Sequence, residues 1–246
     1  MNFHESSTWA NYDPQGHARQ RLERIRSLLP HDVFTILDVG CGNGIITNAL
    51  AEQYAVTGLD PSAAALELVH TPKIQASITQ IPCADRSFDL VSCNEVLEHL
   101  STSELGQGVR ELKRAADKYL LIGVPHREQL AKKQTCCASC GHVWHVHGHL
   151  QSLFPEQLDI FFAPDFERLQ LAIFGARERD FPLWLLRLKH RQGQWFAPPA
   201  GSRCPACGGS DFLQRSNPVT KALNALNLVL SRPRPYWLLA IFQRRT

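Results

Sequence analysis

Short apolar runs alternate with segments of helical periodicity along the first half of the chain. The apolar runs are of strand length, and the segments between them place hydrophobic residues three and four positions apart, as amphipathic helices do. The expected strands cover residues 33–39, 54–59, 73–76, 88–93 and 119–124, and the expected helices cover residues 15–29, 43–53, 62–70 and 104–116. Strict alternation of this kind predicts a parallel sheet with helices on both faces, a doubly wound α/β fold.

This rhythm ends after Pro125. We then expect a Cys/His-rich loop (134–149), a helix (155–162), a strand (166–174), a segment rich in Pro, Gly, Arg and Trp that contains the second Cys pair (175–216), an amphipathic helix (220–230) and a last strand (236–242). The chain divides accordingly into a core at residues 1–125, a first Cys-rich loop at 126–150, a return to the core at 151–175, a basic aromatic insertion at 176–216, and a C-terminal helix and last core strand at 217–246. The second half therefore predicts a small insertion carried by the α/β core.

The glycine-rich segment Asp38-Val39-Gly40-Cys41-Gly42-Asn43-Gly44 follows the first expected strand and precedes a helix. Glycines there permit a tight turn and a close approach of the backbone to a ligand, and the helix N-terminus presents unpaired N–H groups. Asp60 follows Gly40 by twenty residues, at the end of the second expected strand, where a carboxylate can accept hydrogen bonds from both hydroxyls of a ribose. We expect an adenosine-containing ligand at this edge of the sheet, although a plain strand-to-helix turn would use the same glycines.

Two departures from the dinucleotide-binding fingerprint decide between ligands. The third glycine, Gly44, comes one position early, and Ile45 occupies its place. The carboxylate of Asp38 would repel a pyrophosphate but suits a ligand with a cationic amino group. The segment therefore favours S-adenosylmethionine over NAD.

Three segments, in their order and spacing, resemble the class I S-adenosylmethionine-dependent methyltransferases. They are ILDVGCGNG (36–44), GLDPS (58–62) and IPCADRSFDLVSCNEVLEHL (81–100), and the resemblance extends over about residues 19–124 and the last strand. It implies an enzyme with a Rossmann-like, mostly parallel sheet whose last strand is antiparallel. The cofactor residues that follow from it are Asp38, Gly40, Cys41, Gly42 and Gly44 along the methionyl part, Asp60 and Pro61 at the ribose, Ser77 and Ile78 near the adenine, and Asn94 at the strand-end wall. Ser77 departs from the Asp that the family often has there.

The first expected helix adds a candidate for the carboxylate of the cofactor. Arg19 stands there with His17 and Arg21, and a guanidinium suits a carboxylate. A solvated helix face is the alternative for these residues.

The segment Glu95-Val96-Leu97-Glu98-His99 follows the fourth expected strand. On a helix, its spacings would put Glu95, Glu98 and His99 on one face beside the substrate. There His99, with Glu95, could act as general base on a hydroxyl acceptor, or the three could bind a divalent cation that lowers the pKa of that hydroxyl, or they could be structural. The EVLEHL string resembles ubiquinone-pathway O-methyltransferases and small-RNA 3′-terminal 2′-O-methyltransferases. That resemblance implies magnesium bound by these residues, with His149 as a further ligand.

Two Cys-x-x-Cys-Gly units predict a structural zinc site. Cys137 and Cys140 form the first pair, and Cys204 and Cys207 form the second. Two residues between the cysteines let both thiolates face one ion, so two such pairs complete a closed tetrahedral site. Redox-active dithiols are the competing interpretation, and Cys136 or the imidazoles of His142, His145 and His147 could replace one thiolate.

Charge differs between the two halves of the chain. Residues 1–125 carry 10 Lys/Arg and 15 Asp/Glu, whereas residues 126–246 carry 16 and 8. The basic, aromatic stretches at 181–191 and 232–237 predict a lid over the pocket, an RNA-binding surface, or a helix lying on a membrane. An anionic partner is expected for this half, and a solvated basic surface is the alternative.

The polar residues 1–13 and the lack of a long apolar run predict a soluble, cytoplasmic protein. We expect the methyl acceptor to be an oxygen of a small molecule, a saccharide or a lipid-linked substrate. Methylation of an RNA end at its 2′-oxygen is one alternative. A catalytically silent S-adenosylmethionine-binding or scaffold protein is another. The sequence leaves the oligomeric state open.

Overall fold

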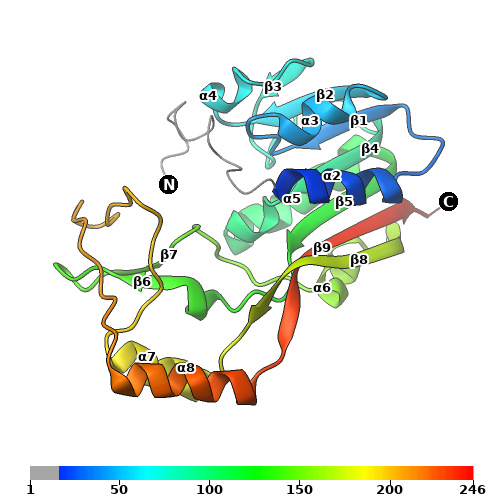
Figure 1. Cartoon of the computed structure of the whole chain (residues 1–246). Coiled ribbons are helices and arrows are strands. Elements are labelled where there is room, and N and C mark those ends of the chain that lie inside the picture. Colours follow the sequence, from blue (N-terminus) through cyan, green and yellow to red (C-terminus); the bar gives the residue numbers. More distant parts are fainter. Residues whose placement is uncertain (1–16, 246) are drawn as a thin grey trace.

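The computed structural model describes residues 17–245, so the predictions for residues 1–16 lie outside the described part. Its main sheet has the strand order β3-β2-β1-β4-β5-β9-β8 (Figure 1). The strands are β1 (Thr35–Val39), β2 (Ala55–Asp60), β3 (Lys73–Gln75), β4 (Phe88–Asn94), β5 (Ala116–Pro125), β8 (Phe166–Arg179) and β9 (Pro233–Arg244). Strands β1 to β5 pair in parallel, and β9 is antiparallel to both β5 and β8. This confirms the predicted doubly wound sheet with an antiparallel last strand.

Helices cover both faces of the sheet because its central strands are apolar on both sides. In β5, Leu120 and Ile122 face one buried cluster while Tyr119 and Leu121 face the other, as the two-residue period of a strand requires. One cluster receives α5 and α6, and the opposite cluster receives α2 and α3. The helices of the core are α2 (His17–Leu28), α3 (Ile45–Leu50), α4 (Ala63–Leu66), α5 (Thr102–Ala115) and α6 (Pro155–Phe162).

The segments beyond Pro125 leave the sheet at the carboxyl edge of its parallel strands. They contain the short helix η2 (Leu130–Lys133), the hairpin β6 (Gln134–Cys136) and β7 (Val143–His145), and the helices α7 (Leu183–Arg191) and α8 (Pro218–Leu230). Strands β8 and β9 continue past the sheet as a two-stranded arm that carries α7 and α8 at its far end (Figure 1). Both strands are therefore longer than expected, and α7 lies within the segment rich in Pro, Gly, Arg and Trp.

Among residues 17–245, none of the helices combines the length and the apolar character that crossing a bilayer requires.

Candidate active site and metal-binding clusters

A cavity of about 410 Å³ opens at the carboxyl ends of β1, β2 and β4, a size typical of sites for small ligands. Its walls come from α2, from the glycine-rich loop, from the segment after β2 and from the segment after β4. The lining residues are Ala18, Arg21, Asp38, Gly40, Cys41, Gly42, Asn43, Ile45, Ile46, Asp60, Pro61, Ser62, Asn94, Glu95, Val96 and His99. The structure thus brings most of the predicted cofactor residues around one cavity.

Gly40 must be a glycine for two reasons: its backbone is left-handed, and its Cα atom lies close to Val96. Gly40 has φ of +74°, and a Cβ atom at this position would lie 2.2 Å from Cγ2 of Val96, which forms the opposite wall. Gly44 also has a left-handed backbone, but it lies behind the loop, where it caps α3 and packs against Val69. Gly44 therefore shapes the loop without lining the cavity, contrary to the role expected for it.

Two carboxylates stand on the floor of the cavity. Oδ2 of Asp60 accepts the N–H of Gly42 at 2.9 Å, and its Oδ1 accepts the N–H of Ser62 at 2.8 Å. Oδ2 of Asp38 accepts the Thr47 hydroxyl at 2.6 Å. Burial raises the pKa of both carboxyl groups, although these hydrogen bonds oppose the rise. Each carboxylate oxygen of Asp60 keeps an unused lone pair, so it can also accept ribose hydroxyls.

Besides Gly44, three predicted cofactor residues do not line the cavity. The side chain of Arg19 is 86% exposed and pairs with Glu23. The side of α2 that faces the sheet carries Ala18 and Ile25 instead, and Arg21 belongs to that side and lines the cavity. Ser77 is exposed, and its hydroxyl lies 2.8 Å from that of Thr79. Ile78 is buried in the hydrophobic core. Arg21 is thus the cation at the cavity that the sequence analysis did not select.

Asn94 stands at the wall of the cavity, as expected. Its Nδ2 donates to the hydroxyl of Ser92 at 2.7 Å. Its Oδ1 is buried without a hydrogen-bond partner among the described residues, which leaves an acceptor available to a ligand.

The predicted helical face at Glu95, Glu98 and His99 is wrong. Glu95 has φ of +56°, and the helix that follows, η1 (Leu97–His99), is a single 3₁₀ turn. The chain therefore bends directly after β4. Glu95 and His99 still line the cavity, whereas Glu98 points into the protein and is 1% exposed.

Glu98, His99 and His149 form a cluster beside the cavity. One ligand atom from each lies within 4.8 Å of the others. Both carboxylate oxygens of Glu98 are buried without a hydrogen-bond partner among the described residues, and burial together with the nearby Glu95 raises the pKa of Glu98 well above its ordinary value. Burial lowers the pKa of His99 to about 4, so its imidazole is neutral at neutral pH. Buried carboxylate oxygens without a partner among the described residues, next to the neutral imidazole of His99, are part of a donor set that fits a divalent cation.

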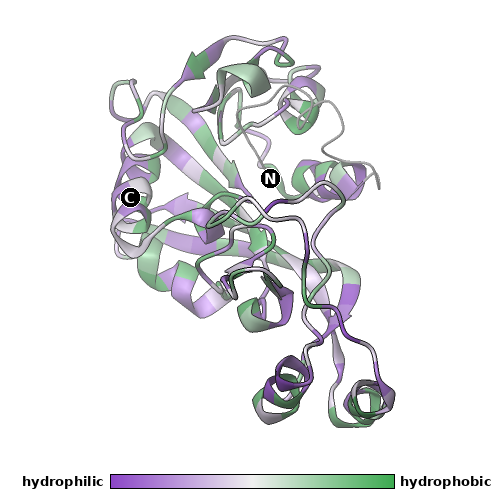
Figure 2. Cartoon of the chain, turned by 90° about the vertical axis from the view of Figure 1, so that its left-hand side faces the viewer, coloured by the Kyte–Doolittle hydropathy of each residue, from purple (hydrophilic) through white to green (hydrophobic). Residues whose placement is uncertain are grey.

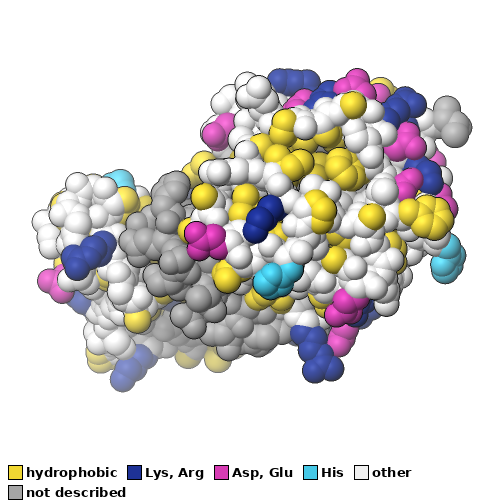
Figure 3. Space-filling view, turned by 90° about the horizontal axis from the view of Figure 1, so that it is seen from above, with side chains coloured by type: hydrophobic (Ala, Val, Ile, Leu, Met, Phe, Trp, Pro, Cys, Tyr) yellow, Lys and Arg dark blue, Asp and Glu magenta, His cyan; other side chains and the backbone are white. Residues whose placement is uncertain are grey.

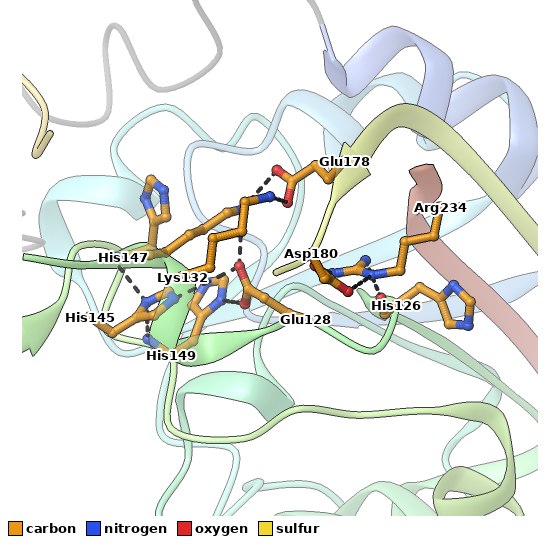
Figure 4. A network of polar contacts seen from close by, with 10 residues as sticks. His126, Glu128, Lys132, His145, His147, His149, Glu178, Asp180 and Arg234 are labelled. Atoms are coloured by element: carbon orange, nitrogen blue, oxygen red, sulfur yellow. Dashed lines mark hydrogen bonds and ion pairs between the residues drawn. The ribbon is translucent and has the colours of Figure 1, made fainter. Parts of the chain in front are cut away.

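Glu128, which the sequence analysis missed, orients His149 from the other side (Figure 4). Its carboxylate contacts Nδ1 of His149 and lies 3.0 Å from Nζ of Lys133, which also pairs with Glu178. Because Nδ1 of His149 faces Glu128, its Nε2 remains for a ligand. Glu128, His145 and His149 also satisfy the spacing of a metal site, but Lys133 already balances the charge of Glu128. The signal for Glu128 was its place three residues after the end of β5, at the cavity edge of the sheet.

The four predicted zinc cysteines come together. The Sγ atoms of Cys137 and Cys207 are 3.6 Å apart, as are those of Cys140 and Cys204, and all four lie within 4.8 Å of one another. These distances exceed a disulfide bond and agree with the sulfur–sulfur spacing of about 3.8 Å around a tetrahedral zinc ion. Cys136 contacts the carbonyls of Cys137 and Gly141 instead of joining the group.

The predicted lid is also wrong. Within the described chain, no residue of 175–234 lines the cavity. Helices α7 and α8 lie at the far end of the β8–β9 arm, away from the strand ends that surround the cavity (Figure 1).

Comparison with known proteins agrees with this fold. Residues 37–118 match a family model described as "Methyltransferase domain". A ubiquinone biosynthesis O-methyltransferase from Albidiferax ferrireducens is 37% identical over 92 residues, which are 32% of this chain and 36% of that protein. The chain thus spans about a third of the length of this curated relative.

Solved structures extend the likeness to the whole chain. A SAM-dependent methyltransferase from Archaeoglobus fulgidus aligns with 93% of each chain at a TM-score of 0.56 and 16% identity. The N-methyltransferase NodS from Bradyrhizobium japonicum, solved with S-adenosyl-L-homocysteine, aligns over the full length of both chains at a TM-score of 0.57 and 17% identity. Residues 37–118 therefore match the model of a methyltransferase domain, and the chain shares the fold of these solved methyltransferases.

Proposed function

We propose that this protein transfers the methyl group of S-adenosylmethionine to an oxygen nucleophile. The observation that carries the proposal is the cavity at the strand ends, where the Gly40–Asn43 backbone faces Asp60 and where Glu95 and His99 form the opposite side. Carboxylates at the floor suit the ammonium and the ribose of this cofactor. A histidine at the wall gives the acceptor a polar neighbour.

The main catalytic contribution that we assign to the chain is the alignment of the acceptor with the cofactor. The sulfonium methyl is electrophilic when the cofactor binds, so the protein must place acceptor oxygen, methyl carbon and sulfur in line. Asp60 would hold the ribose hydroxyls, Asp38 would attract the methionyl ammonium, and Arg21 would attract the methionyl carboxylate. The glycine loop allows the backbone to approach the ligand.

We propose that a divalent cation, magnesium as the family resemblance implies, prepares the acceptor. Glu98, His99 and His149 would hold it, and Glu128 would act as a positioning residue through Nδ1 of His149. The ion would lower the pKa of an acceptor hydroxyl. Direct proton abstraction by neutral His99, without metal, is the competing mechanism.

Zinc at Cys137, Cys140, Cys204 and Cys207 is proposed as a purely structural feature. Four thiolates fill a tetrahedral site, so no position remains for a reacting group. The ion would tie the turn of the β6–β7 hairpin to the loop of Cys204 and Cys207, and Cys204 follows Cys140 by 64 residues.

The acceptor class that we favour is a small molecule, a saccharide or a lipid-linked compound. The curated relative named above acts in ubiquinone biosynthesis, which supports oxygen as the accepting atom. An RNA end remains the second candidate, because the EVLEHL string is shared with the small-RNA enzymes. A silent cofactor-binding scaffold is disfavoured by the presence of both Glu95 and His99 at the cavity.

The proposed activity is tested by incubating the purified chain with methyl-labelled cofactor and separate quinone-precursor, saccharide, lipid and RNA fractions. We expect label in one fraction, an at least tenfold loss for His99→Ala, and near wild-type transfer for His142→Ala, an exposed histidine outside the cavity. Chelator should abolish transfer and magnesium or manganese should restore it. Transfer that resists chelation would leave the metal-free mechanism, and no labelled fraction together with no cofactor binding would refute the proposal.

A further inference from the structure

Helices α7 and α8 lie side by side at the end of the β8–β9 arm (Figures 1 and 2). The arm is held at its base by Arg234, whose guanidinium contacts both carboxylate oxygens of Asp180 at 2.8 and 3.0 Å. It leaves the sheet at the same edge as the cavity, because β8 ends and β9 begins there. The helix pair is thus a projection on the cavity side of the sheet, at a distance from the cavity itself.

Helix α8 has an inverted pattern of burial. Its buried residues are the polar Thr220 and Asn227, while Leu228 is 63% exposed and Val229 is 83% exposed. The exposed stripe at Val219, Ala222, Leu226 and Val229 follows the spacing of one helical face. Apolar faces of this kind are normally buried, so this one is a candidate contact surface for a partner outside the described chain.

Helix α7 adds a mixed apolar and cationic face. Leu183, Trp184 and Leu188 are exposed, and Arg187 and Arg191 emerge on the same side of the helix. Leu185 and Leu186 fill the buried side. A half-exposed tryptophan beside arginines is typical of helices at the boundary between lipid and water.

Charge decides between a bilayer and a second copy of the chain. The sequences of α7 and α8 contain four Lys/Arg residues and no Asp/Glu. Arg187 and Arg191 lie on the exposed face, so pairing of two copies through it would bring four guanidinium groups together without a balancing acid, whereas anionic headgroups would neutralise them. The face seen from above in Figure 3 differs, since Lys/Arg and Asp/Glu mix along its rim.

We propose that α7 and α8 attach the protein to the surface of an anionic phospholipid bilayer. Val219, Leu226, Val229, Trp184 and Leu188 enter the headgroup region, and Arg187 and Arg191 bind the headgroups. The helices lie on the membrane and do not cross it. This attachment is independent of the proposed methyl transfer.

The test is flotation of the full chain with phosphatidylcholine vesicles that contain about a quarter phosphatidylglycerol. We expect the wild type to float with these vesicles, to float poorly with pure phosphatidylcholine, and to be released by high salt. Val229→Glu, and separately the pair Arg187→Gln and Arg191→Gln, should lower the partition coefficient about tenfold. Ile160→Glu is the matched control, because Ile160 is an exposed apolar residue on α6, outside this surface.

Calorimetry should give the same cofactor affinity for wild type and Val229→Glu. That result would show that the variant is folded, so its reduced flotation reflects weaker membrane attachment. Wild-type protein that stays at the bottom of the gradient would overturn the proposal, as would undiminished flotation of both variants. Sedimentation that shows a dimer dissociated by Val229→Glu would assign the surface to a second copy instead.

Discussion

Asp60 connects the glycine loop to the segment after β2, and this position makes it the residue on which cofactor binding should depend most. Its carboxylate accepts N–H groups from Gly42 and Ser62 and faces the cavity. Asp60→Ala should therefore weaken S-adenosylmethionine binding by about a hundredfold, equivalent to about 3 kcal/mol, measured by calorimetry. Glu67→Ala, which removes an exposed carboxylate beyond the cavity, should leave the affinity unchanged. Equal affinity for wild type and Asp60→Ala would rule out this role.

Substitutions at Gly40 and Gly201 distinguish two costs of adding a side chain, namely backbone strain and steric collision. Both have left-handed backbones, but a Cβ atom at Gly40 would collide with Val96, whereas nothing lies within 4 Å of one at Gly201. Gly201→Ala should cost about 1 kcal/mol of unfolding free energy from backbone strain alone. Gly40→Ala should cost about 3 kcal/mol and weaken cofactor binding as well. Urea unfolding of both variants measures the difference, and equal losses would contradict the close packing of loop and wall.

At the scale of secondary-structure elements, Asp89 of β4 connects three strands near their amino-terminal ends. It accepts hydrogen bonds at the start of β1 and forms an ion pair with Lys118 of β5. Burial would raise its pKa, but hydrogen bonds from the N–H groups of Thr35 and Phe34 and contact with Lys118 lower it to about 2. Because the folded-state pKa lies below the unfolded value, this carboxylate stabilises the fold above about pH 4 and loses the effect as pH falls towards 2.

Asp89→Asn should therefore cost about 2 kcal/mol of unfolding free energy at pH 7 and about 1 kcal/mol at pH 3. Denaturant unfolding at the two pH values checks this. Glu52→Gln, at a largely exposed carboxylate, serves as the control and should change little at either pH. A cost for Asp89→Asn that does not change with pH would show that its ionisation does not contribute.

The elements were predictable where hydrophobic periodicity persists over several residues. The central strands were found because they are apolar on both faces, and the helix ending at Ala115 was found because Leu105, Val109 and Leu112 share its buried side. The segment after β4 could not be predicted, because the left-handed backbone of Glu95 is imposed by packing of the loop and not by local propensity. The choice of Arg19 over Arg21 failed because only contact with the sheet defines which side of α2 faces inward.

Across the whole molecule, the proposed zinc ion holds the insertion without supporting the core. Cys204→Ser should reduce bound zinc from one ion per chain to much less, measured by elemental analysis, and should increase proteolysis within residues 134–215. Cofactor affinity should remain within about twofold of wild type, because no cysteine of the cluster lines the cavity. Cys83→Ser, a cysteine outside the cluster, is the control. Wild-type protein that is folded and free of zinc would disprove the zinc site.

The arrangement of the insertion was beyond the reach of the sequence. The paired Cys-x-x-Cys units indicated which cysteines meet, since their spacing is a local property. That α7 projects on an arm instead of covering the cavity depends on how far β8 and β9 continue past the sheet. Their pairing from Arg177 to Arg179 with Pro233 to Pro235 is a long-range contact that no local pattern encodes.

A crystal structure with S-adenosyl-L-homocysteine tests the central claim most directly. The account predicts the ribose hydroxyls within hydrogen-bond distance of Asp60, the amino-acid part against Gly40 and Arg21, and the sulfur directed towards His99. A ligand bound elsewhere, or a cavity that stays free of it at saturating concentration, would contradict the assignment of this cavity and the methyl transfer proposed from it.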